Sequence, residues 1–134
     1  MHWRPIYPYF HKVHHEFKHT ISISSEHAHF VEFIFGNMLP SNLGIILLGS
    51  KCHAVTWGLW LTFKILKTSE GHSGYHLPWS PFNYFPFIVL ASEFHNYHHL
   101  KFKHNYGGVF AFWDTVCGTV HPVYRDYDFN RKYD

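Results

Sequence analysis

The chain has 134 residues, which is enough for one domain. Apolar residues make up 46% of it and aromatic residues 21%, but charged residues reach only 15%, below the roughly 25% usual in soluble domains. The net charge of +2, with no basic stripe among stacking aromatics, argues against a nucleic-acid-binding module. Two isolated cysteines, Cys52 and Cys117, give no disulfide framework and no C-x-x-C zinc motif.

The first segment of interest is a histidine cluster near the start of the chain. His11, His14 and His15 form a His-x-x-His-His motif. On a helix, positions i, i+3 and i+4 share one face, so the three imidazoles would point the same way. Imidazole suits iron, zinc, copper and nickel. A single cluster of this kind is equally compatible with hydrogen-bonded core histidines or a histidine-rich tract.

Two apolar runs follow. Residues 33–50 contain no formally charged side chain, and residues 54–66 are interrupted only by Lys64. A single helix needs about 20 residues to cross a bilayer, so each run is marginal alone, and Pro40 weakens a straight helix through the first. We predict a membrane-embedded helical hairpin with Lys51 near its tip; a buried pair of helices in a soluble protein is the alternative.

The segment after the hairpin, residues 69–86, is rich in glycine and proline and predicts a structured loop that carries His72 and His76. Residues 87–100 predict a helix that enters a second His-x-x-His-His motif, formed by His95, His98 and His99. A glycine- and aromatic-rich closing segment spans residues 105–119, and a charged tail follows from residue 124. The predicted fold class is therefore all-α.

The histidine pattern as a whole predicts a binuclear metal site. Two His-x-x-His-His clusters about eighty residues apart, with a His-x-x-x-His pair between them, supply more imidazoles than one ion can bind. Both clusters must reach the same ions, so the hairpin between them has to return to the side it left. Lysine and arginine are concentrated outside the hairpin, which predicts that the metal site faces the cytosol. A soluble zinc-binding module is the least favoured alternative.

Four motifs resemble the fatty acid hydroxylase and sterol desaturase superfamily: His-Lys-Val-His-His-Glu-Phe over 11–17, the block over 26–32, His-Ser-Gly-Tyr-His-Leu-Pro-Trp-Ser over 72–80, and His-Asn-Tyr-His-His over 95–99. The resemblance covers about residues 2–119. Within the superfamily the sequence is most similar to the C4-methylsterol monooxygenases. Cholesterol 25-hydroxylases and sterol C5-desaturases are also similar.

This resemblance implies a non-haem di-iron oxygenase of the endoplasmic reticulum membrane that uses O2 and takes electrons from cytochrome b5 and its NAD(P)H reductase. It implies nine metal ligands: His2, His11, His14, His15, His72, His76, His95, His98 and His99. His76 departs from the acidic residue of many methylsterol oxidases. His2 matches the second histidine of a motif whose first would lie four residues upstream, so residues 1–134 are expected to be one partial domain, truncated at its N-terminus.

Further roles are expected around these ligands. His29 and Glu32 lie in a family block and are candidates for hydrogen bonding to a ligand imidazole, with structural capping as the alternative. Tyr75, Trp79 and Phe82 are candidates for a substrate slot, or for an aromatic belt at the membrane interface. The expected function is C4-methylsterol oxidation in sterol biosynthesis. The alternatives are hydroxylation or desaturation of another lipid (sterol C5, cholesterol side chain or fatty acyl chain) and an inactive, metal-binding membrane protein.

Overall fold

The computed structural model describes residues 1–84 and 92–125, and in those ranges it is helical with no strand, which confirms the predicted all-α class. The elements in chain order are α1 (His11–His14), η1 (Ser22–Glu26), α2 (Phe30–Glu32), η2 (Phe33–Met38), α3 (Leu39–Leu48), η3 (Gly49–Lys51), α4 (Ala54–Gly71), η4 (Pro81–Tyr84), α5 (Ser92–Lys101), α6 (Phe112–Val116) and α7 (Pro122–Arg125). Part of the predicted 87–100 helix and most of the tail fall outside the described residues.

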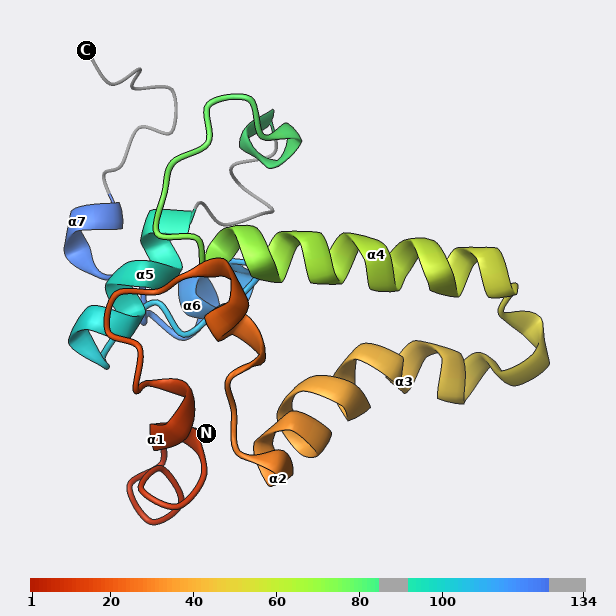
Figure 1. The fold of residues 1–134 in the computed structure, drawn as a ribbon, viewed down its shortest axis with the longest axis horizontal. Helices are drawn as coiled ribbons and strands as arrows, with labels where there is room; N and C mark the ends of the chain where they lie inside the picture. Colours follow the sequence, from red (N-terminus) through yellow and green to blue (C-terminus); the bar gives the residue numbers. More distant parts are fainter. Residues whose placement is uncertain (85–91, 126–134) are drawn as a thin grey trace.

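A long two-helix arm projects from the body of the molecule (Figure 1). The α3 helix runs out along it and α4 returns, so that both ends of the arm meet the body on the same side. Gly49 makes the turn possible, because its φ of 54° is one that side chains with a Cβ rarely adopt. Lys51 lies in the turn, as predicted. The predicted hairpin is thus confirmed as a fold, while its embedding in a membrane stays a prediction.

The outgoing helix passes Pro40 without a break. Pro40 lies in the first turn of α3, directly after the π-helical segment Phe33–Met38. A π segment widens the helix and shifts its hydrogen-bond register, which is how a helix accommodates a residue that cannot donate. The helix therefore continues from Phe30 to the tip of the arm.

The arm is apolar on the outside. Among the described residues one helix, Phe30–Lys51, is long and apolar enough to cross a membrane, with 22 residues, a mean hydropathy of 1.5 and only 6% of its apolar window buried. The returning helix also exposes large apolar side chains, and Leu59 is 67% exposed. An apolar surface of this extent normally meets a lipid or protein partner.

Polar bonds join the two helices of the arm. The Trp57 indole donates to Asn42 Oδ1 (3.0 Å), and the Trp60 indole donates to the Ser41 carbonyl (2.8 Å). Nearer the body, the Lys64 ammonium donates to Asn37 Oδ1. Hydrogen bonds of this kind hold helices together where an apolar surrounding gives no hydrophobic drive for association.

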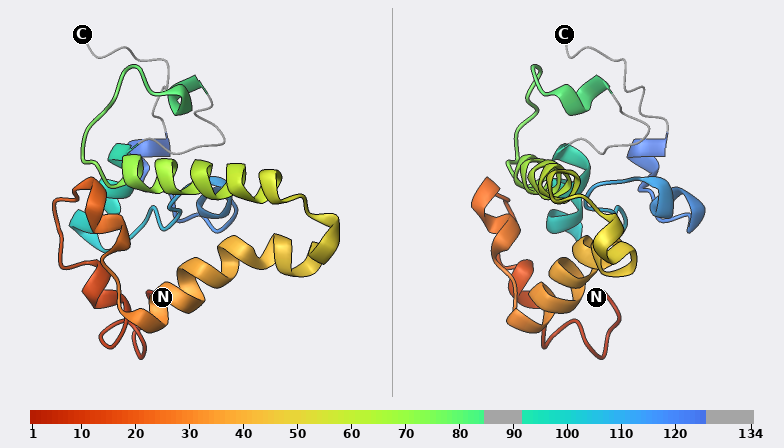
Figure 2. Two further views of the ribbon diagram at one scale, coloured as in Figure 1. Left: turned by 45° about the vertical axis from the view of Figure 1, so that its right-hand side comes forward. Right: turned by 90° about the vertical axis from the view of Figure 1, so that its right-hand side faces the viewer.

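The body has a polar core. Of the large apolar side chains that the structure describes, only Phe94 is fully buried, at 3% exposure. The other buried side chains are polar or charged, and six of them are histidines. The α5 helix packs against α4 where the arm joins the body, and the N-terminal segment lies beside them (Figure 2). The interior is therefore organised around imidazoles rather than around hydrocarbon.

Asp114 secures the segment that closes this core. It is 2% exposed and accepts three hydrogen bonds, from the Tyr106 amide (2.9 Å), the Gly107 amide (2.6 Å) and the Thr119 hydroxyl (2.5 Å). These bonds tie the loop after α5 and the segment after α6 to the α6 helix itself. Removing either the carboxylate or its donors would leave buried polar groups without a hydrogen-bond partner, which costs stability.

We predict that Asp114→Ala lowers the free energy of unfolding by about 3 kcal/mol, because two buried amides and a hydroxyl lose their acceptor. Denaturant titration of the detergent-solubilised protein measures the change. Glu26→Ala, which removes an exposed carboxylate, serves as the control and should stay within about 0.5 kcal/mol of the unmodified protein. Equal losses in the two variants would contradict this role of Asp114.

Candidate metal centre

Histidines from four parts of the chain meet at the base of the arm. They come from the N-terminal segment, from α1 and its C-cap, from the C-cap of α4, and from α5. Figure 1 shows these segments gathered around the point where α4 enters the body. The hairpin fold brings them together, because α4 ends on the same side as α1.

The histidines form two groups of four. We call the first the outer group (His2, His11, His15 and His98) and the second the inner group (His14, His72, His95 and His99). Within each group one candidate ligand nitrogen per residue lies within 4.8 Å of all the others. All four members of the inner group are buried, whereas two members of the outer group are half-buried.

The Nε2 atoms in each group point at one another. In the inner group Nε2 of His72 lies 3.3 Å from that of His14 and 3.1 Å from that of His95. In the outer group Nε2 of His2 lies 2.8 Å from that of His11 and 2.9 Å from that of His98. Two nitrogens that share an ion at about 2.0–2.1 Å lie about 3.0–3.4 Å apart. The spacing agrees with shared ions to within a few tenths of an ångström.

Hydrogen bonds on the far side of the rings fix their tautomers. Three imidazoles donate from Nδ1 to a backbone carbonyl: His14 to His27 (3.1 Å), His72 to Thr68 (2.9 Å) and His98 to His104 (2.8 Å). A carbonyl can only accept, so the proton must be on Nδ1, and Nε2 presents a lone pair to the centre of its group. That is the tautomer in which imidazole binds a metal through Nε2.

Burial keeps the rings neutral. Desolvation, helped by the neighbouring imidazoles, lowers the pKa of His2 to about 3. The pKa values of His72 and His98 fall to about 4, again chiefly through desolvation. Desolvation also lowers the pKa of His95. At neutral pH these groups therefore offer lone pairs rather than positive charge.

The residues fit metal ions. The Nε2 lone pairs of His14 and His72 face and repel one another, because both rings carry their proton on Nδ1, and a cation placed between them would reverse the sign of that interaction. His99 is fully buried, and its Nε2 has no hydrogen-bond partner among the described residues. An orphaned buried nitrogen is costly unless something binds it. The groups also adjoin, because the ring centroids of His15 and His99 lie 4.5 Å apart, so two ions would lie close together.

Glu32 supports the outer group. Its Oε1 lies 2.6 Å from Nδ1 of His11, and the residue is only 8% exposed. A carboxylate in this position orients the imidazole and makes it more basic toward a metal. His29, the other candidate for this role, instead caps α2, since its Nδ1 accepts the Val31 amide at 3.2 Å. The structure thus places His29 in the capping role.

Strained backbone supplies one of the supporting carbonyls. Phe102, His104 and Asn105 all have positive φ, between 54° and 65°, which is uncommon for residues other than glycine. The fully buried Asn105 side chain holds the turn by donating to the Phe94 carbonyl (3.3 Å) and accepting the His121 amide (2.9 Å). The strained turn thereby fixes the His104 carbonyl as the hydrogen-bond acceptor for Nδ1 of His98.

His76 lies outside both groups. Its Nδ1 is 3.0 Å from Glu93 Oε1, and its side chain is 40% exposed. The His-x-x-x-His spacing places two rings on one face only along a helix, but α4 ends at Gly71 and the chain turns at Gly74, where φ is 74°. The loop therefore carries His76 away from His72. The eight residues that the structure brings together are the other expected ligands.

The expected slot residues also lie elsewhere. Tyr75 and Trp79 are 73% and 74% exposed, and neither lines a cavity that reaches the histidines among the described residues. The Phe82 ring packs against Phe63, with centroids 5.5 Å apart, and under the Lys67 ammonium at 4.9 Å.

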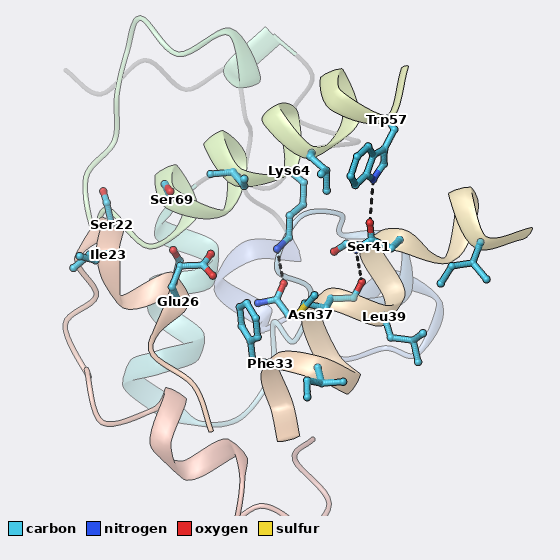
Figure 3. A pocket seen from close by; sticks show the side chains of 17 residues that line it. Ser22, Ile23, Glu26, Phe33, Asn37, Leu39, Ser41, Trp57, Lys64 and Ser69 are labelled. Atoms are coloured by element: carbon cyan, nitrogen blue, oxygen red, sulfur yellow. Dashed lines mark hydrogen bonds between the residues drawn. The ribbon is translucent and has the colours of Figure 1, made fainter. Parts of the chain in front are cut away.

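A cavity that reaches the histidines lies at the base of the arm instead. A cavity of about 370 Å³ is lined by His14, His72 and His95 at one end and by Lys64 at the other. A groove of about 1240 Å³ between the arm helices adjoins this cavity, and the two share lining at Ser25, Asn37, Ser41 and Lys64. Figure 3 shows the groove, with Lys64 reaching across it to Asn37. Sequence reasoning missed these residues, although the lone lysine in an apolar run was a usable signal.

Comparison of the sequence with known proteins identifies its family. A sequence model of the fatty acid hydroxylase family matches residues 1–119. The chain is 41% identical over 89% of its length to methylsterol monooxygenase 1 of Rattus norvegicus, and 37% identical over 99% to that of Danio rerio. It is 38% identical over 89% to the very-long-chain aldehyde decarbonylase GL1-11 of Oryza sativa subsp. indica. The chain spans 39–44% of the length of these relatives. No solved structure matches it.

We predict that His72→Ala and His76→Ala have different effects on bound metal. His72 belongs to the inner group, so its loss should release one of the two ions, whereas His76 pairs with Glu93 and its loss should leave the metal content unchanged. Elemental analysis of the purified, iron-reconstituted variants measures the difference. Equal metal loss in both variants would show that His76 is a ligand as well.

We predict that Glu32→Gln weakens metal binding about 10- to 100-fold, because an amide is a poorer acceptor for the His11 ring and does not raise its basicity. Competition with a chelator of known affinity measures the change. The matched control is Glu16→Gln, which breaks a similar pair (2.8 Å) with the exposed His27. If the two variants bind metal equally well, Glu32 does not support the site.

Proposed function

The chain belongs to the fatty acid hydroxylase family, and from that premise we propose that it acts as a non-haem di-iron oxygenase on a membrane sterol, oxidising a methyl group at C4. The observation that carries the proposal is the pair of four-histidine groups at the base of an apolar arm. The names of the rat and zebrafish relatives, both methylsterol monooxygenases, support the substrate class.

The outer and inner groups would each hold one iron ion. Two iron ions bound there would supply the O2-dependent oxidation of an unactivated C–H bond, a reaction beyond the reach of side chains alone. The protein's own contribution is geometric. The backbone carbonyls of His27, Thr68 and His104 hold three rings with Nε2 inward, and Glu32 holds a fourth. Because the rings are fixed before metal or substrate binds, little reorganisation is needed during the reaction.

The arm would deliver the substrate. Its exposed apolar surface would face lipid, and the groove between its helices leads to the cavity lined by His14, His72 and His95. A sterol that enters from the membrane would bring its reacting end to the inner group while its apolar body stays in the groove. The filled passage would also exclude water from the centre.

We place the protein in the endoplasmic reticulum membrane, with the metal centre facing the cytosol and with cytochrome b5 and its NAD(P)H reductase as electron source. The distribution of charge supports this orientation. Lys12, Lys18, Lys101 and Lys103 are exposed and lie outside the arm. Positive residues favour the cytosolic side of a membrane.

A second candidate substrate is a very-long-chain aldehyde. The rice relative that carries this name is 38% identical to the chain, close to the identity of the methylsterol monooxygenases. The same metal groups and the same groove would serve a linear chain. The two substrates differ in shape, so a direct assay separates them.

The test is conversion by membranes that contain the chain, expressed in a strain lacking sterol C4-demethylation. We expect O2-dependent loss of 4,4-dimethylsterol and the appearance of oxidised C4 products, both abolished by His72→Ala. A parallel incubation uses a very-long-chain aldehyde. Iron-loaded protein that converts the aldehyde and leaves the sterol untouched would contradict the sterol assignment. Iron-loaded protein that converts neither would contradict the oxygenase proposal.

A further inference from the structure

The arm groove holds a positive charge that the proposed metal chemistry does not use. Lys64 is the only lysine, arginine, aspartate or glutamate between Lys51 and Lys67, in an otherwise apolar helix. It is half-buried and lines both the groove and the cavity that leads to the inner group. A charge inside an apolar segment is costly, so its position calls for a functional explanation with a named partner.

The partner that the structure gives Lys64 is a neutral one. Its ammonium donates to the Asn37 side-chain oxygen across the groove (Figure 3). An amide carries no negative charge, so this bond does not neutralise the lysine. The carboxylates of Glu26 and Glu32 line the same groove and the same cavity. An ammonium has three hydrogens to donate, and Asn37 can take up one of them along this direction. The pair therefore keeps the capacity to bind a further oxygen.

Two helical rows lead from this pair to the metal centre. On α4, Trp60, Lys64, Thr68 and His72 follow one another at intervals of four and line the same cavity. On the opposite helix Glu32, Gly36 and Pro40 do the same. Lys64 and His72 are eight residues apart, or about 12 Å along the helix axis. The long lysine side chain shortens the gap further when it turns toward the cavity.

We propose that Lys64 and Asn37 bind the hydroxyl oxygen of the sterol substrate and so set which carbon faces the inner group. This inference rests on the proposed function and adds the recognition element to it. The occupant is an apolar ring system with one hydrogen-bond-accepting oxygen close to the carbon to be oxidised. Its hydroxyl lies at the junction of groove and cavity, its reacting end in the cavity, and its apolar body in the groove.

The lining of the two spaces supports this division. The groove is lined mainly by apolar side chains of the arm, such as Ile46, Leu61 and Ile65, and its volume of about 1240 Å³ exceeds the roughly 300–1,000 Å³ of ordinary small-molecule sites. The cavity of about 370 Å³ is smaller and ends at His14, His72 and His95. A large apolar body therefore fits the groove, and only the end of a ring system fits the cavity.

A site built to hydrogen-bond a hydroxyl discriminates against the analogue that lacks it, because the buried polar groups are then left unpaired. The experiment compares equilibrium binding of 5α-cholestan-3β-ol and 5α-cholestane to the solubilised chain, by displacement of radiolabelled cholestanol. Neither probe has a C4 methyl group, so binding is read without turnover. We expect the alcohol to bind at least about tenfold more tightly, as one hydrogen bond to a charged donor predicts.

Three variants locate the effect. Lys64→Met should abolish the preference for the alcohol while leaving cholestane binding and iron content unchanged, and Lys64→Arg, which keeps a cationic donor, should retain a preference. The control is Lys51→Met at the tip of the arm, which should behave as the unmodified chain. Should Lys64→Met fold poorly, its iron content reports this, and Asn37→Leu tests the same junction from the opposite helix.

The inference is overturned if the unmodified chain binds the two probes equally, binds neither, or keeps its preference in a Lys64→Met protein that retains iron. None of these results bears on iron binding or sterol oxidation, which are measured separately. The chain could instead fail to oxidise the sterol and still prefer the alcohol in a way that depends on Lys64. That result would contradict the proposed function but support the recognition site.

Discussion

The structure depends on the convergence of eight imidazoles in the body. His14 and His72 both carry their proton on Nδ1, and their Nε2 lone pairs lie 3.3 Å apart, an arrangement that is repulsive unless a cation lies between the rings. Desolvation lowers the pKa values of His72 and His98 to about 4, so protonation does not supply that positive charge at neutral pH. Metal binding and folding of the body are therefore expected to be strongly linked.

This constraint accompanies an unusual distribution of polar and apolar side chains, with polar side chains buried in the body and apolar side chains exposed on the arm. The body buries histidine, Asn105 and Asp114 but, among the described residues, only one large apolar side chain, whereas the arm exposes leucine, isoleucine and tryptophan. Hydrogen bonds to carbonyls and to Glu32 brace the rings from outside, and those bonds require the strained turn at 102–105 and the last turn of α4. The apolar surface left over is the one that a lipid-facing arm needs.

Sequence patterns predicted the parts that depend on local spacing. The His-x-x-His-His motifs place their rings together, and the two apolar runs form the hairpin, with Lys51 at its tip. Spacing failed where the local structure changed. His76 follows His72 by four residues, but α4 ends at Gly71, so no helix places the two rings on one face. The His76 ring pairs with Glu93 instead. The aromatic loop residues Tyr75 and Trp79 are exposed, and the cavity that reaches the histidines is lined partly by Asn37 and Lys64, which are far apart in sequence.

X-ray absorption spectroscopy at the iron edge, with the iron content of the same sample, tests the central claim most directly. The account predicts two ions per chain, a first shell dominated by nitrogen, the outer-shell scattering pattern of imidazole, and no sulfur ligand. A single ion, or a first shell that is mostly oxygen or contains sulfur, would contradict the convergence of the two histidine groups on a binuclear centre.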